Sequence, residues 1–376
     1  MDDHDPATTA TTVVGIDDSD AAPAVLRHAV LEASRRHGRV HAISTYEPPE
    51  GWSWAYGLDL QPELERIGEA ALVHARGVVD RVLADLPRDL DPVPELELDV
   101  VAGRAGDVLV DSAAGADMLV VGHRGRGRLG SIVFGSVGLS CVLHAPCPVT
   151  VVPAVSDDPP AAAAGTVVVG VDGSDCAREA LQHALRDADR RGDRVLAISV
   201  YEPPEDWNPW SYGLAVLPGR EELERRQLAL TRRFVDEVVA SIRPELATEP
   251  KVEVQTHPGT ATHVLTVASR GADALHIGPR GRGAVGSAAL GSVGLGCVVH
   301  ASCPVTVALP AHTKPSDRAE PAAGHREGEP PGVQTAENEL AYERHPRLPG
   351  HREAEPIGEQ ARDAVRAAED LRRRSF

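Results

Sequence analysis

The sequence predicts an α/β fold with two tandem domains, each built on a doubly wound parallel sheet. One observation is a glycine pattern, Gly122-x2-Gly125-x9-Gly135-Ser136, that returns 156 positions later as Gly278-x2-Gly281-x9-Gly291-Ser292. The other is that short runs of Val, Ile and Leu alternate with longer helical segments. Continuous apolar runs between helices are typical of parallel strands buried on both faces, and right-handed crossovers then place helices on both sides of the sheet.

In the first repeat, the apolar runs predict five strands: Thr12–Ile16, Val40–Thr45, Glu95–Val101, Met118–Val121 and Val149–Val152. Asp17-Asp18-Ser19 predicts a turn and a helix cap after the first strand, and that helix is expected to stop near Gly38. The other predicted helices run from Pro62 to Leu86, from Gly106 to Ala114 and from Gly135 to His144.

The second repeat has the same order of elements, with predicted strands at Val167–Val171, Val195–Val200, Val252–Thr256, Ala274–Ile277 and Val305–Leu309. We therefore expect domains at residues 12–153 and 165–309, after an N-terminal tail of residues 1–11. The Ala-, Pro- and Asp-rich residues 154–164 are typical of a linker. Residues 310–376 have few large apolar side chains, so we expect a mostly disordered, charged tail.

The net charge of -18 argues against a general binder of nucleic acid or of anionic membranes, because both would be repelled. The acidic start Met1-Asp2-Asp3 does not resemble a signal peptide, and no apolar run approaches the length of a membrane span, so the expected location is the cytoplasm. Four of the five cysteines recur in both repeats at a spacing that fits neither zinc nor redox motifs. We expect them to be small buried side chains, with a redox role as the alternative.

The glycine loops have features of a phosphate-binding site. Each leaves the carboxyl end of a strand, where doubly wound sheets bind ligands, and each ends at the N-terminus of a helix, where phosphate is favoured. Arginines add positive charge, at Arg124, Arg126 and Arg128 in the first loop and at Arg280 and Arg282 in the second. The alternative is that these arginines are solvated surface charges or pair with carboxylates. Neither loop has the Gly-Lys-Ser/Thr of a P-loop, and neither follows the first strand as a dinucleotide fingerprint would.

Asp17 and Asp172 follow the first strand of each repeat, where a carboxylate can accept hydrogen bonds from a ribose or a base. Helix capping is the alternative role. Together with the glycine loops and the His-Ala-x-Cys-Pro-Val approach to the fifth strand, these residues resemble the universal stress protein family in its tandem form. The resemblance covers about residues 12–309.

The resemblance implies Rossmann-like domains with strand order 3-2-1-4-5 and an ATP-binding cleft between strands one and four. By position, Asp17 and Asp172 would contact the adenosine, and the backbones of Thr45 and Val200 would meet the adenine. Gly122 and Gly278 would lie by the ribose. The remaining residues would hold phosphates, with Mg²⁺ as the expected metal: Gly125, Gly135, Ser136, Gly281, Gly291 and Ser292, with Arg124 and Arg280 as cations. The fifth strands are expected to pair within the chain as a pseudo-twofold pair, and a homodimer is a further possibility.

Two departures from the family pattern bear on the sites. Asp18 stands where the second repeat has Gly173, and repulsion of phosphate there is expected to weaken the first site by ~1 kcal/mol. Pro279 replaces His123 and lacks a backbone donor, which argues for a weaker second site. All four tryptophans lie in the loops after the second strand of each repeat, as Trp52, Trp54, Trp207 and Trp210. They are expected either to pack over the domains or to form a lid or partner surface.

Three functions are compatible with these features. The first is a binding and signalling module in which ATP, or another adenine nucleotide such as AMP or cAMP, changes a state that an unknown protein partner reads. The second is a slow ATPase or a nucleotidyl-transferring enzyme. No base is duplicated in the two repeats, since Pro279 replaces His123, so no catalytic residue is assigned and strong catalysis is not expected. The third is a dimerisation scaffold that binds no nucleotide, against which two intact glycine loops argue.

Overall fold

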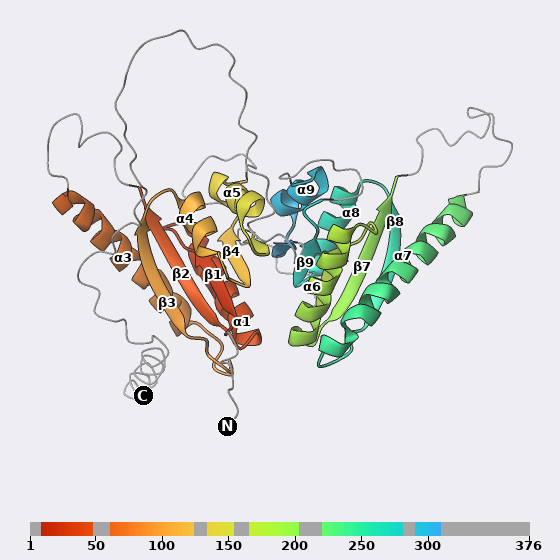
Figure 1. Cartoon of the computed structure of the whole chain (residues 1–376), viewed down its shortest axis with the longest axis horizontal. Coiled ribbons are helices and arrows are strands. Elements are labelled where there is room, and N and C mark those ends of the chain that lie inside the picture. Colours follow the sequence, from red (N-terminus) through yellow and green to blue (C-terminus); the bar gives the residue numbers. More distant parts are fainter. Residues whose placement is uncertain are drawn as a thin grey trace, which may run out of the picture.

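The computed structural model describes residues 9–47, 61–123, 134–153, 165–202, 220–280 and 290–309, and the account below concerns these residues. They contain one sheet of ten strands in the order β3-β2-β1-β4-β5-β10-β9-β6-β7-β8 (Figure 1). The strands of the first repeat are β1 Thr11–Gly15, β2 Arg39–Tyr46, β3 Leu96–Ala102, β4 Met118–Gly122 and β5 Val149–Val152. Those of the second are β6 Thr166–Gly170, β7 Arg194–Tyr201, β8 Val252–Pro258, β9 Ala274–Ile277 and β10 Val305–Val307.

Each repeat forms one half of this sheet, and its own strands are all parallel. Read from either outer edge, the strand order within the repeat is 3-2-1-4-5, which confirms the predicted topology. The first strand of each repeat therefore lies between its second and fourth strands. Their carboxyl ends meet at one edge, which is where a doubly wound sheet presents its ligand site.

Helices cover both faces of the sheet (Figure 1). In the first repeat they are α1 Ala22–Arg35, α3 Gln61–Ala84, α4 Ala105–Ser112 and α5 Ser136–His144. In the second they are α6 Asp175–Arg191, α7 Arg220–Ile242, α8 Ala261–Ala268 and α9 Ser292–His300, with short 3-10 turns at Arg243–Glu245 and Ser269–Gly271. None of the helices within the described ranges has the length and apolar character needed to cross a membrane.

The core is divided unequally between the two faces. On the face covered by α4, α5, α8 and α9, one cluster of buried residues runs through both repeats, from Val13 and Leu109 to Leu275 and Val305. On the opposite face, α1 and α3 enclose one cluster and α6 and α7 enclose another. The two repeats therefore share a continuous apolar core on one face only.

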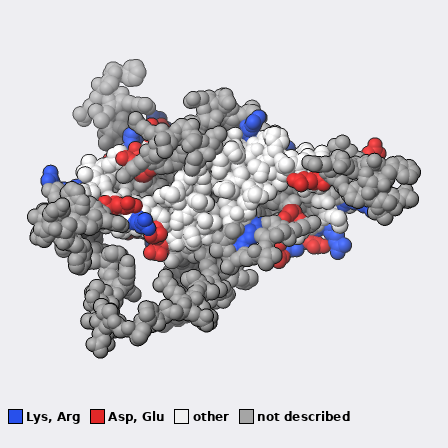
Figure 2. Space-filling model, turned by 90° about the horizontal axis from the view of Figure 1, so that it is seen from above, with Lys and Arg blue, Asp and Glu red and all other residues white. Residues whose placement is uncertain are grey.

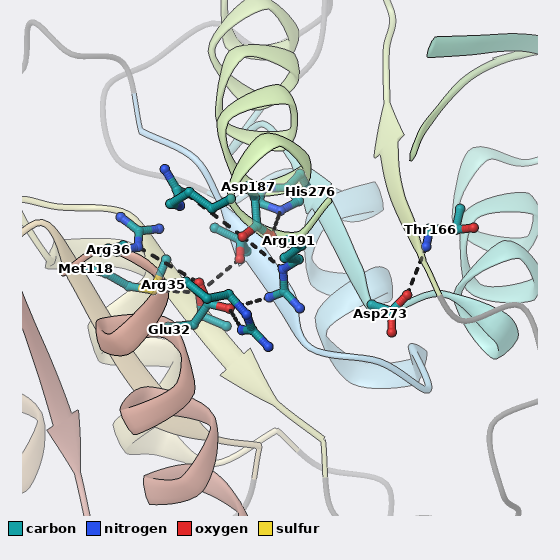
Figure 3. Close-up of polar contacts among 12 residues, drawn as sticks. Glu32, Arg35, Arg36, Met118, Thr166, Asp187, Arg191, Asp273 and His276 are labelled. Carbon is teal, nitrogen blue, oxygen red and sulfur yellow. Dashed lines mark hydrogen bonds and ion pairs between the residues drawn. The ribbon is translucent and has the colours of Figure 1, made fainter. Parts of the chain in front are cut away.

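The junction between the repeats is an antiparallel pairing of β5 with β10, in which Thr306 lies opposite Thr150. Their buried hydroxyl oxygens are 2.9 Å apart. On the face of α1 and α6, charged side chains occupy the junction (Figure 3). Glu32 of α1 forms ion pairs with Arg35 and with Arg191 of α6, and Arg191 also contacts Asp187 at 2.9 Å. His276 of β9 approaches Asp187 at 3.2 Å.

The observed elements differ from the predicted ones mainly at their ends. The cap predicted at Ser19 is wrong, because α1 begins at Ala22 after Ala21, whose side chain makes no capping bond. Pro23 in the first turn suits this later start, because a proline there gives up no helical hydrogen bond. The strand predicted to end at Leu309 ends at Val307. The predicted linker, the tail from residue 310, the four tryptophans and the N-terminal residues 1–8 lie outside the described residues.

Candidate functional site

A cavity of about 430 Å³ opens at the carboxyl edge of the second repeat. Six of the seven residues predicted for that site line it: Asp172, Val200, Gly278, Arg280, Gly291 and Ser292. The seventh, Gly281, lies outside the described residues. The volume falls within the range of roughly 300–1,000 Å³ that is usual for small-molecule sites. The fold thus brings residues that are far apart in the sequence to one cavity.

The walls of the cavity are mostly apolar. Side chains of the described strands and helices form them, at Val171, Ala177, Ile198, Ala261, Leu265, Ile277 and Val293. These wall residues were not predicted from the sequence as part of the site. One feature of the sequence could have pointed to them. A glycine, Gly15 or Gly170, stands at the end of the first strand in both repeats, where it makes room for a wall side chain. A Cβ atom on Gly170 would lie 2.9 Å from a methyl carbon of Leu265, so the glycine gives Leu265 its place in the wall.

Asp172 is held by the turn that connects β6 to α6. Its Oδ1 atom accepts hydrogen bonds from the Ser174 hydroxyl at 2.6 Å and from the Ser174 backbone N–H at 3.0 Å. Ser174 Oγ in turn accepts a hydrogen bond from the N–H of Ala177 and caps the helix. Capping therefore belongs to the serine. The carboxylate is thereby fixed beside the cavity.

The glycine loop and α9 form the polar end of the cavity. Gly278 lies against the first turn of α6, and a Cβ atom there would be 2.8–2.9 Å from the Cβ, carbonyl carbon and carbonyl oxygen of Cys176. The N–H of Gly291 donates to the carbonyl oxygen of Pro279 at 2.8 Å and closes the loop on itself. Ser292 then begins α9, whose first residues line the cavity. The positive end of a helix dipole and the N–H groups of its first turn favour an anion here.

The first repeat places its predicted site residues in corresponding positions. Asp17 follows β1 and accepts bonds from the Ser19 hydroxyl at 2.5 Å and from its N–H at 3.1 Å. Thr45 lies on β2 and Gly122 at the end of β4, on either side of β1. Gly135 donates to the carbonyl oxygen of His123 at 3.2 Å, and Ser136 begins α5. Arg124 and Gly125 lie outside the described residues.

Two kinds of side chain with catalytic potential, one histidine and the repeated cysteines, are buried in the protein interior. His123 is 6% exposed, and its ring lies 5.6 Å from that of Phe134. The repeated cysteines are free and buried, as expected. Burial raises the pKa of each of these four thiols to about 12, so they are protonated at neutral pH: Cys141, Cys147, Cys297 and Cys303. A neutral thiol is a poor nucleophile, which argues against the redox alternative.

Viewed from above, toward the side on which α5 and α9 lie, the middle of the described surface carries few charged side chains (Figure 2). Charged groups lie mainly toward its edges. Among the described residues that line the cavity, Arg280 and Asp172 are the charged ones. Among the described residues, the attraction available to an anion therefore comes from Arg280 and the backbone rather than from a broad basic patch.

Comparison with known proteins gives one consistent result. The model of the universal stress protein family matches residues 9–153 and 164–308. A universal stress protein of Mycolicibacterium smegmatis is 30% identical over 305 residues, which cover 81% of this chain and 98% of that protein. One from Mycobacterium tuberculosis is 28% identical over 325 residues and covers 82% and 97%. The crystal structure of a universal stress protein from Archaeoglobus fulgidus has the same fold, with a TM-score of 0.54 and 18% identity over 79% of this chain and 95% of that one.

Proposed function

The chain belongs to the universal stress protein family in its tandem form, and from that premise we propose that it is an ATP-binding module of a stress response. The observation that carries this proposal is the cavity shared by Asp172, Val200 and Gly278 with the start of α9. Its apolar walls suit a purine, and its polar end suits phosphate. In the proposed complex, the backbone of Val200 meets the adenine edge and Asp172 accepts hydrogen bonds from the ribose.

The phosphates would lie at the N-terminus of α9, with Gly291, Ser292 and Arg280 around them. Mg²⁺, when bound, would neutralise phosphate charge. The equivalent set in the first repeat is Asp17, Thr45, Gly122, Gly135 and Ser136, with Arg124 and Gly125. The proposed contacts recognise the adenosine more specifically than they distinguish one, two or three phosphates. AMP and cAMP are therefore competitors to be tested beside ATP.

We favour binding and signalling over hydrolysis. Asp172 is the only acid among the described residues that line the cavity, which include no histidine, and Ser174 already donates two bonds to its Oδ1 atom. His123 packs on Phe134, and its counterpart in the second repeat is Pro279. A hydrolase needs a group that positions water, and these surroundings offer no repeated candidate. The proposed output is therefore recognition of the occupied protein by a partner.

The test is a calorimetric titration of Mg-ATP into the full chain and into an Asp17→Ala/Asp172→Ala variant. Loss of a hydrogen bond to a charged acceptor costs roughly 1.5–3 kcal/mol, so affinity should fall roughly 10- to 100-fold. Asp80→Ala, on an exposed position of α3, serves as the control and should bind like the parent. Absence of saturable heat with ATP, AMP and cAMP would contradict the proposal and leave the scaffold function.

A further inference from the structure

The two repeats differ in the turn that presents the aspartate to the proposed site. In the second repeat, Gly173 has φ +80°, a conformation that glycine adopts readily. The chain then passes directly through the Ser174 cap into α6 at Asp175. In the first repeat the same position is Asp18, which is not among the described non-glycine residues with positive φ.

The path of the turn consequently changes. Helix α1 begins at Ala22, two positions later in its repeat than α6, and without a side-chain cap. In the second repeat the first turn of α6 borders the cavity, since Ala177 lines it and Gly278 lies against Cys176. The first repeat lacks this early turn of helix next to its aspartate. The positive end of the α1 dipole therefore lies farther along the chain from Asp17 than that of α6 lies from Asp172. Because the effect of the dipole falls off within about one turn, it favours an anion less in the first repeat.

Charge acts in the same direction. The turn of the first repeat carries three carboxylates, Asp17, Asp18 and Asp20, whereas that of the second carries Asp172 and Asp175. Asp18 is exposed. An additional negative charge near a phosphate site opposes binding of a nucleotide polyanion.

The sequence offered one argument in the opposite direction, namely that Pro279 lacks a backbone donor. In the structure, however, the missing donor would not face a ligand. In the first repeat, the equivalent N–H of His123 donates to the carbonyl oxygen of Val152 at 2.8 Å, so this donor is committed to β5. The carbonyl oxygen of Pro279 still accepts the bond from Gly291 that closes the loop. Proline at this position thus gives up a contact with a strand rather than a contact with a ligand.

We propose that the two clefts are unequal, that the cleft of the second repeat binds the nucleotide first, and that the residue between aspartate and serine, Gly173 or Asp18, determines this order. The inference rests on the proposed function and assigns its primary site. It makes the first repeat a secondary site that fills only at higher nucleotide concentration, although its glycine motif is intact.

The experiment titrates Mg-ATP into the full chain and into the two single variants Asp17→Ala and Asp172→Ala. We expect Asp172→Ala to remove the tighter binding event and Asp17→Ala to leave it. In the Asp172→Ala background, Asp18→Asn should raise the affinity of the remaining site by roughly fivefold, which corresponds to about 1 kcal/mol. Asp18→Gly should raise it further, because it also restores the turn. Asp80→Asn is the matched control and should have no effect.

The reciprocal change is made in the Asp17→Ala background. Gly173→Asp should weaken binding at least fivefold, and Gly173→Asn should weaken it less, because asparagine tolerates positive φ and adds no charge. Thermal unfolding of each variant separates loss of binding from loss of fold. Equal titrations for the two single alanine variants, or no response to either Asp18 substitution, would overturn the inference while leaving nucleotide binding in place. A parent chain that binds no nucleotide would instead overturn the proposed function.

Discussion

Single glycines in this fold serve close contacts rather than flexibility alone. The clearest case is Gly278, where a Cβ atom would lie within 2.9 Å of the backbone carbonyl of Cys176. Gly294 and Gly296 likewise leave room for Leu290 and Thr262. The chain after β9 can therefore approach the first turn of α6, and α9 can approach Leu290 and α8, only because these side chains are absent.

Replacing Gly278 by alanine is expected to destabilise the protein by roughly 1–3 kcal/mol, because backbone must move to admit the methyl group. The same change should widen the gap between the glycine loop and α6 and weaken nucleotide binding. Chemical denaturation gives the stability change and calorimetry the affinity. Gly77→Ala is the control, since a Cβ atom there meets nothing within 4 Å. In the middle of α3 that change should stabilise by roughly 0.5–1 kcal/mol. Equal effects of the two substitutions would contradict the close-contact argument.

Six residues that line the cavity could be predicted from the sequence, because the glycine pattern and the aspartate after the first strand occur in both repeats. The role of each glycine could not be predicted, since the pattern is the same whether a glycine faces a ligand or a neighbouring helix. The consequence of Pro279 could not be predicted from the sequence for a related reason. A missing donor matters to a ligand only if that donor points to the ligand, and hydrogen bonding across to β5 is a property of the folded sheet.

At the scale of elements, the repeats show how one motif gives two helix starts. Asp-x-Ser follows the first strand in both, yet Ser174 caps α6 and Ser19 does not cap α1. The difference depends on the intervening residue and on Pro23, so the sequence predicted the helix but not its first residue. The chain leaves both helices through a residue with positive φ. After α6 this residue is Gly192, whereas after α1 it is His37, which is not a glycine. Gly38 serves packing, since its Cβ would lie 2.3 Å from the carbonyl oxygen of Ala10.

Substituting Ser174 by alanine should destabilise the protein by about 1 kcal/mol more than substituting Ser19. Both changes remove a hydrogen bond to the preceding aspartate, but only Ser174→Ala also removes a helix cap. The two single variants thus control for each other, and urea denaturation measures the difference. If Ser19→Ala proved the more damaging, the assignment of the cap to α6 alone would be wrong.

At the scale of the whole molecule, the halves are joined by three different contacts. The sheet is continuous through β5 and β10, the core is continuous on one face, and buried charges meet on the other. The charged residues derive from a duplicated pattern, His-x3-Glu/Asp-x2-Arg-Arg, at residues 28–36 and 183–191. The resemblance implied the pairing of fifth strands. The charged contact was not predicted, because amphipathic periodicity cannot show that the polar side of α1 faces another repeat.

Arg191→Met is expected to destabilise the protein by up to about 3–5 kcal/mol, because it removes the buried cation that bridges Glu32 and Asp187, whose other cationic partners are more exposed or more distant. The Glu32→Met/Arg191→Met double variant should recover part of this loss, since it also removes one of the two buried carboxylates that Arg191 bridges. Arg225→Met is the control. Its pair with Glu222 is exposed to solvent, so the loss of stability should be small. Similar losses from Arg191→Met and Arg225→Met would show that the junction contributes little.

The same junction should make stability depend on pH. Burial lowers the pKa of His28 to about 4, and Arg191 acts in the same direction while Glu32 opposes it. Burial likewise lowers the pKa of His183 to about 3, assisted by His276 and Arg36. Between the ordinary value of 6.5 and these values, the unfolded chain takes up protons that the folded chain does not. The free energy of unfolding therefore falls as the pH falls through this window, by on the order of 1.4 kcal/mol per unit of pKa shift.

Asp187 should not add to this loss within the window. Burial alone would raise the pKa of its carboxyl, but His276 and Arg191 hold it well below 3.8, so the group is ionised throughout and its contribution is lost only in stronger acid. A His28→Gln/His183→Gln variant should show a flatter dependence of unfolding free energy on pH between about 6.5 and 4. His263→Gln, on an exposed position of α8, should retain the slope of the parent. An unchanged slope in the double variant would mean that the histidines of the junction are not held neutral by the contact between the two repeats.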